Sequence, residues 1–145
     1  MKQRLAIACA LTLCATITLA HTGVKNAAVL ARMHGMKTIA DNVKVLGSMS
    51  KGQVAFDAKS ARAAAAAIES HAAQSIALFT PKESDPKSEA LPAIWENFDD
   101  FTAKARDLEA VAGELAISLE SLEDVRAAMG RIGATCKACH AIYRE

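Results

Sequence analysis

The sequence is poor in aromatic residues and in proline. Phe, Trp and Tyr together make up 4% of the 145 residues, and there are three prolines. Hydrophobic residues still account for 52% of the chain, and many of them are alanine. Alanine favours helices, whereas aromatic and β-branched residues favour strands. The composition therefore predicts an all-α protein, and the length suits a single domain.

Long apolar runs are also scarce. The one uncharged apolar run of note, residues 5–19, follows two basic residues and ends before the small residue Ala20. This arrangement predicts a cleaved signal peptide at 1–20 and a mature domain at 21–145, exported to the periplasm of a Gram-negative bacterium. The alternative is a transmembrane anchor, but the run is shorter than the roughly 20 residues that a span needs.

The sequence has few cysteines and little net charge. Of the four cysteines, Cys9 and Cys14 lie in the predicted signal peptide, so Cys136 and Cys139 have no other cysteine to form a disulfide with. Lipidation at Cys14 is disfavoured by the bulky Leu13 before it. Without its signal peptide the chain has 15 basic and 16 acidic residues, a net charge of −1 with His neutral. We therefore expect no nucleic-acid partner and no membrane insertion of the mature chain.

The two remaining cysteines belong to a motif near the C-terminus, Cys136-Lys137-Ala138-Cys139-His140. The pattern C-x-x-C-H is the attachment signal for a c-type haem. Its two thiols add to the haem vinyl groups, and the adjacent histidine becomes the proximal ligand of the iron. We predict one covalent haem c, held by two thioether bonds from Cys136 and Cys139, with His140 as an axial ligand.

Two other uses of the motif are less consistent with the rest of the chain. A structural zinc site needs four ligands, and there is neither a second C-x-x-C nor a paired histidine motif. A thioredoxin-like redox pair belongs in a βαβ setting, and no segment here alternates like a strand.

Four amphipathic stretches follow the predicted signal peptide. Apolar residues recur at steps of three and four, which is typical of helices that bury one face. Both motif cysteines continue the apolar seam of the last stretch. The helices are expected at about 24–50, 58–79, 92–119 and 121–143. Their predicted end signals are Gly52, Asp57, Pro81, Pro92, and Ser121 with Asp124. The connections are short apart from 80–91, so we predict an antiparallel up-down-up-down four-helix bundle with covalently bound haem.

A C-x-x-C-H in the last helix of such a bundle resembles the cytochrome c′ family, most closely its low-spin cytochrome c-556 type. The resemblance extends over residues 24–145. It is carried by the motif region 132–144, by the turn at 51–57, and by the start of the third helix at 91–95.

The resemblance also implies candidate residues on the first helix. The family position opposite the proximal histidine corresponds to Met36, where low-spin members use a methionine as the second axial ligand. Five-coordinate members keep the iron open there, and some of them carry an unbound methionine. Met36 could also be plain core packing. Arg32 matches a basic family position near the haem propionates, and a solvated surface arginine is the alternative. Independently of the resemblance, Arg144 lies one turn past His140, where it could contact the haem pocket or act only as a cation at the helix end.

These residues support two functions. A His/Met-ligated haem would make the protein an electron carrier that serves redox partner proteins, as a monomer or homodimer, and not an enzyme. A five-coordinate iron would instead bind nitric oxide or carbon monoxide. Peroxidase-like catalysis would need polar acid/base groups opposite His140, and the helix face around Met36 is apolar.

Overall fold

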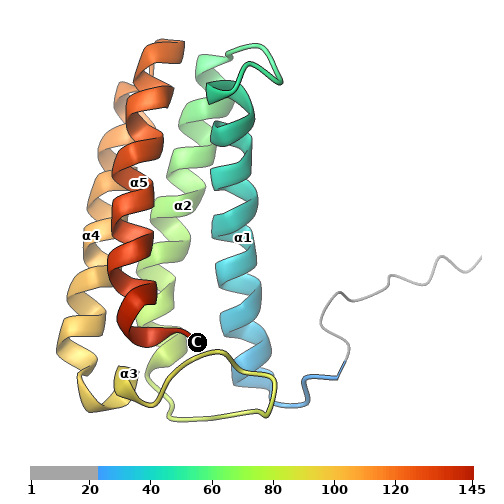
Figure 1. Ribbon diagram of the computed structural model, residues 1–145, viewed down its shortest axis with the longest axis vertical. Coiled ribbons are helices and arrows are strands. Elements are labelled where there is room, and N and C mark those ends of the chain that lie inside the picture. The colour runs from blue at the N-terminus through green and yellow to red at the C-terminus, as the bar shows by residue number, and fades with distance from the viewer. Residues whose placement is uncertain (1–22) are drawn as a thin grey trace, which may run out of the picture.

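The structure is a computed structural model, and it describes residues 23–145. Within these residues, four long helices and one short helix form, and the long ones stand side by side with the short one at the lower end (Figure 1). Successive long helices run in opposite directions, and the contacts follow the ring α1, α2, α4, α5 and back to α1. The predicted up-down-up-down bundle is confirmed. The predicted signal peptide at 1–20 lies outside the described residues.

The first two helices are α1, Ala27–Ser50, and α2, Ala58–Phe79. At the end of α1, Gly52 has a φ of 68°, a left-handed conformation that glycine adopts without strain. Asp57 then caps α2 by accepting a hydrogen bond of 2.7 Å from the backbone N–H of Ser60. Both end signals were predicted correctly. Helix α1 begins three residues later than expected, because the side chain of Asn26 caps it.

The third predicted helix is two helices, α3 at Ala93–Glu96 and α4 at Phe98–Ser118. The prediction of a single helix from Pro92 to Leu119 is therefore wrong at Asn97. Asn97 has φ −132° and ψ 50°, so the helical backbone is interrupted there. The break turns α3 across the end of the bundle, where the indole N–H of Trp95 donates a hydrogen bond of 2.8 Å to the carbonyl of Phe79.

The last helix, α5, spans Leu122–Tyr143 and carries the C-x-x-C-H motif in its final turns. The predicted capping box is present: the Ser121 hydroxyl accepts from the N–H of Asp124, and the Asp124 carboxylate accepts from the N–H of Ser121. No helix within residues 23–145 is both long and apolar enough to span a membrane.

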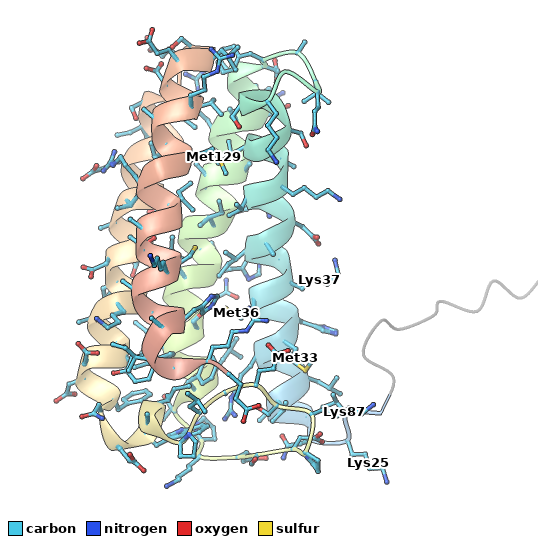
Figure 2. The ribbon with its side chains drawn as sticks, viewed as in Figure 1. Lys25, Met33, Met36, Lys37, Lys87 and Met129 are labelled. Carbon is cyan, nitrogen blue, oxygen red and sulfur yellow. The ribbon has the colours of Figure 1, made fainter. Side chains whose placement is uncertain are left out.

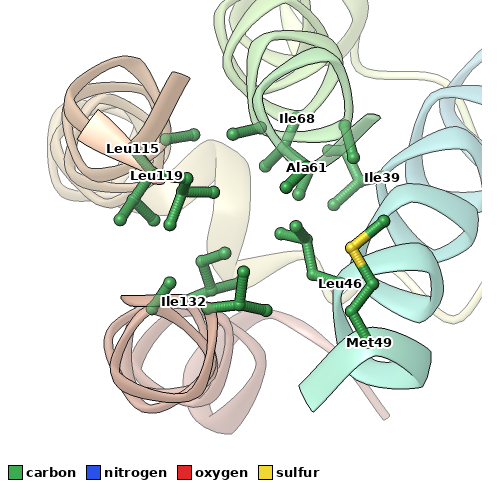
Figure 3. Close-up of a cluster of buried hydrophobic side chains, with 13 residues drawn as sticks. Ile39, Leu46, Met49, Ala61, Ile68, Leu115, Leu119 and Ile132 are labelled. Carbon is green, nitrogen blue, oxygen red and sulfur yellow. The ribbon is translucent and has the colours of Figure 1, made fainter. Parts of the chain in front are cut away.

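The core has two parts. The larger cluster of buried side chains is aliphatic and lies among the four long helices (Figure 3); it includes Leu46, Ile68, Leu119 and Ile132. The smaller cluster lies at the lower end and consists of Phe79, Ile94, Phe101 and Tyr143, with Trp95 and Phe98 packed against it. Of the six aromatic residues in the sequence, five are in or beside this smaller cluster. The scarce aromatic surface is thus concentrated at the end of the bundle that carries the motif.

Candidate haem site

A cavity of about 360 Å³ lies at the lower end of the bundle. This is within the usual size range of small-molecule and cofactor sites. Helix α1 forms one wall and the end of α5 forms the other. All four residues of the smaller core cluster line it, as do Lys87, Glu89 and Ala90 from the α2–α3 connection. The walls are mostly apolar, and the polar lining residues are charged side chains and one histidine.

The α5 wall presents the motif. Cys139 and His140 line the cavity, whereas Cys136 lies one turn earlier, half-buried against the larger core cluster. Neither Cys136 nor Cys139 is in a disulfide. Their spacing on the helix places both thiols along the inner seam, as the heptad pattern predicts. Residues 23–145 contain no group of three or more His, Cys, Asp or Glu side chains suited to a metal ion.

Partial desolvation shifts the pKa of all three groups, although His140 is exposed overall. Desolvation raises the pKa of the Cys136 thiol and that of the Cys139 thiol. It also lowers the pKa of His140, and the nearby positive charge of Arg144 lowers it further. Both thiols are therefore neutral near pH 7, and the imidazole favours its neutral form. A neutral imidazole keeps the nitrogen lone pair that an iron ligand must supply.

The α1 wall presents two methionines, Met33 and Met36, and both line the cavity (Figure 2). Both are half-buried. They differ in their packing: Met36 packs against both core clusters, whereas Met33 is not among the residues packed against either. Cys136 also packs against the larger cluster and Cys139 against the smaller one. Met129 lies well away from the cavity, toward the other end of the bundle. The structure thus places Met36 in the same cavity as His140, on the facing helix.

Arg32 lies on the same wall but is almost fully buried, with 3% of its surface exposed. Its Nε donates to the carbonyl of Leu78 at 2.9 Å, its Nη1 to that of Glu83 at 2.7 Å, and its Nη2 to that of Pro81. The guanidinium also lies 4.9 Å from the ring centre of Phe79. Desolvation lowers its pKa, and the charge of Glu83 opposes that shift. Arg32 therefore lines the predicted pocket with its guanidinium already engaged by backbone carbonyls.

Arg144 also lines the cavity, at the C-terminal end of α5. It forms an ion pair with Glu89, with an Nε–Oε2 distance of 2.6 Å. Sequence reasoning missed Glu89 because 55 residues separate the two partners. The other two histidines within residues 23–145 lie elsewhere: His34 is exposed on α1 and His71 is half-buried on α2, and neither lines the cavity.

These residues fit a c-type haem. The Cys139 thiol and His140 line an apolar cavity from α5, with the Cys136 thiol one turn earlier on the same seam, and neither thiol is in a disulfide. A thioether sulfur, a soft ligand suited to haem iron, lines the cavity from α1. The fold and this donor set together define a four-helix bundle of the c-type cytochrome class.

Comparison with known proteins is consistent with that class. Residues 27–144 match the family model described as Cytochrome C'. Cytochrome c-556 of Agrobacterium tumefaciens (strain II Chrys) is 44% identical over 110 residues, covering 75% of this chain and 89% of that protein. Cytochrome c-554 of Cereibacter sphaeroides is 34% identical over 151 residues, covering 100% and 99%.

Among solved structures, a nitric oxide complex of a variant of cytochrome c prime from Alcaligenes xylosoxidans superposes with a TM-score of 0.70 at 30% identity, covering 81% of this chain and 94% of that one. The chain belongs to the cytochrome c′ family, whose members are c-type haem electron carriers.

Proposed function

We propose that this protein is a periplasmic electron carrier with one haem c, bound through thioethers from Cys136 and Cys139 and ligated by His140 and Met36. The observation that supports it most directly is that Met36 and His140 line a single cavity from facing helices. Bound haem supplies a one-electron couple between ferric and ferrous iron.

Each residue has a distinct part in this proposal. With haem bound, the neutral imidazole of His140 would supply a nitrogen lone pair from α5. The thioether of Met36, a soft and uncharged ligand, would favour the reduced state and leave no open position for a gas. The thioether bonds of Cys136 and Cys139 would fix the orientation of the group relative to α5. The apolar side chains of the smaller core cluster exclude water, which limits reorganisation when the charge changes.

The α1 wall argues against an enzymatic role. Its lining residues are Val29, Arg32, Met33, Met36, Lys37 and Ala40, so it offers no carboxylate or imidazole to act as a base. The guanidinium of Arg32 is engaged by three carbonyls. We therefore propose electron transfer to redox partner proteins and not peroxidase-like catalysis.

A second candidate function is gas binding by a five-coordinate iron. The nitric oxide complex of the similar Alcaligenes xylosoxidans protein favours it. In that case Met36 would be a packing residue in the smaller and larger core clusters.

The absorption spectrum of the purified protein tests both proposals. Methionine ligation predicts a sharp low-spin α band in the ferrous protein and a weak near-infrared charge-transfer band in the ferric protein. Carbon monoxide should then bind slowly, because Met36 must leave first. A high-spin spectrum with rapid carbon monoxide uptake would replace the electron-carrier proposal with the gas-binding one.

A further inference from the structure

The connection between α2 and α3, residues 80–92, contacts both helices that carry the proposed iron ligands. Sequence reasoning treats it only as the longest loop. In the structure it crosses the lower end of the bundle, beside the cavity (Figure 1). Its first half is bonded to α1 and its second half to α5.

Arg32 makes most of the contacts that hold the first half of the connection to α1. Its guanidinium donates to the carbonyls of Pro81 and Glu83 in the connection and to that of Leu78 at the end of α2. It packs over the rings of Phe79 and Trp95, 4.9 and 5.2 Å from their centres. Arg32 lies one helical turn before Met36 on the same face of α1. The contacts of Arg32 therefore fix the part of α1 that carries Met36.

Asp85 adds hydrogen bonds to the two residues that precede α1. One carboxylate oxygen accepts hydrogen bonds from the backbone N–H groups of Lys25 and Asn26, at 2.9 and 3.2 Å. The other accepts from the N–H of Lys87 at 3.0 Å. These bonds lower the pKa of Asp85, so the carboxylate is charged near neutral pH. Asp85 is buried and does not line the cavity, so its hydrogen bonds act on the backbone beside the cavity and not on the cavity directly.

The second half of the connection is bonded to the end of α5. The N–H of Leu91 donates to the carbonyl of Tyr143, and the N–H of Glu145 donates to the carbonyl of Glu89, both at 3.0 Å. The side chains of Glu89 and Arg144 add an ion pair. These contacts begin three residues after His140.

We propose that residues 80–92 act as a brace that sets the separation of α1 and α5 at the cavity, with Arg32 and Asp85 as the positioning residues for Met36. The inference rests on the proposed ligation by Met36. A thioether is a weak ligand, so the bond depends on how closely the backbone holds it, as is general for groups that orient metal ligands. The three carbonyls take three of the five N–H groups of Arg32, so this positioning role is separate from any contact that the other two make with a haem carboxylate.

The test compares haem-loaded Arg32→Met and Asp85→Asn with the wild-type protein. Arg32→Met keeps an apolar stem and removes every donor. We expect a larger high-spin fraction and carbon monoxide association faster by roughly tenfold or more, since charged hydrogen bonds of this kind are worth at least one tenfold step. Asp85→Asn should shift both readouts in the same direction by less. Arg32→Lys should give a high-spin fraction and a carbon monoxide association rate between those of the wild-type protein and Arg32→Met, because one ammonium cannot reach three separate carbonyls.

Leu119→Ala is the control for general destabilisation, because Leu119 is fully buried in the larger core cluster and does not line the cavity. It should lower stability and leave the spectrum unchanged. The inference is overturned if Leu119→Ala shifts the spin state as much as Arg32→Met does. It is also overturned if folded Arg32→Met and Asp85→Asn keep the wild-type spin state and binding rate, or if Arg32→Met changes only the reduction potential. If Arg32→Met fails to fold, the spin state and binding rate of Asp85→Asn and Arg32→Lys test the inference instead. A high-spin wild-type protein would refute Met36 ligation itself, and this inference with it.

Discussion

Replacing Met36 by alanine is the perturbation that separates the two proposed functions most sharply. Met36 is half-buried and packs against both core clusters, on the wall that faces His140. Alanine cannot reach an iron atom held by α5, so the sixth position should open. The variant should become high-spin, bind carbon monoxide readily and show a lower reduction potential, because the thioether no longer favours ferrous iron.

The same substitution also removes packing. Truncating a fully buried methionine to alanine costs about 2–5 kcal/mol of unfolding free energy. Because Met36 is only half-buried, we expect the lower end, about 2 kcal/mol, before the lost iron bond is counted. For a domain of this size that corresponds to a fall in Tm of roughly 8 °C. The spectrum must therefore be recorded on protein whose helical circular dichroism shows it to be folded.

Met33→Ala is the matched control. Met33 is also half-buried, lies on the same helix and lines the same cavity, but it belongs to neither core cluster. It should leave the low-spin spectrum and the slow carbon monoxide binding intact. If Met33→Ala opens the sixth position and Met36→Ala does not, Met33 is the ligand. If neither variant differs from a wild-type protein that is already high-spin, Met36 only packs and the gas-binding function stands.

Three further outcomes are expected. A double Cys136→Ser, Cys139→Ser variant should release its haem into acidified acetone, which the wild-type protein should not; covalent haem in the variant would refute the attachment. N-terminal sequencing of exported protein should begin at or near His21, whereas an intact N-terminus on membrane-bound, haem-loaded protein would indicate an anchor. The hydroxyl of Tyr143 donates a 2.6 Å hydrogen bond to Asp100, which raises the pKa of Tyr143 to about 12. Folding favours the protonated phenol. The stabilisation of the folded state by this hydrogen bond is therefore fully present below the unfolded pKa of about 10 and is lost as the pH rises toward 12. In Tyr143→Phe the loss of stability between about pH 10 and pH 12 should be smaller than in the wild-type protein. An unchanged dependence of stability on pH would contradict this role of Tyr143.

Local signals in the sequence were sufficient to predict most of the helix ends. Asp57 caps α2 and Ser121 caps α5 through side-chain bonds that reach three residues along the chain. Such contacts depend on the neighbouring sequence alone, so their residue types predict them. The left-handed turn at Gly52 is of the same kind.

Features that depend on distant residues could not be read in this way. The true start of α1 is determined by Asn26 and by its bond to Asp85, 59 residues further on. The role of Arg32 depends on carbonyls about 50 residues away, and a backbone carbonyl carries no signature in the sequence. The break at Asn97 falls in an apolar repeat that continues across it, because Ile94 and Phe101 are buried on both sides. Periodicity detects the buried face and misses the change in direction.

The two ends of the bundle use different residues because they must meet different requirements. Along α2 the alanines permit a close approach to α4, where a Cβ added at Gly113 would come within 2.8 Å of the carboxylate of Glu69. At the other end the larger aromatic side chains meet in a cluster that forms part of a cavity wall. An opening between helices exposes apolar surface and weakens their contact, so the helices beside it need other bonds to hold them in place. The polar contacts of residues 80–92 with α1 and α5 supply such bonds at the level of the cavity, which is why the polar chemistry of this loop bears on the proposed iron site.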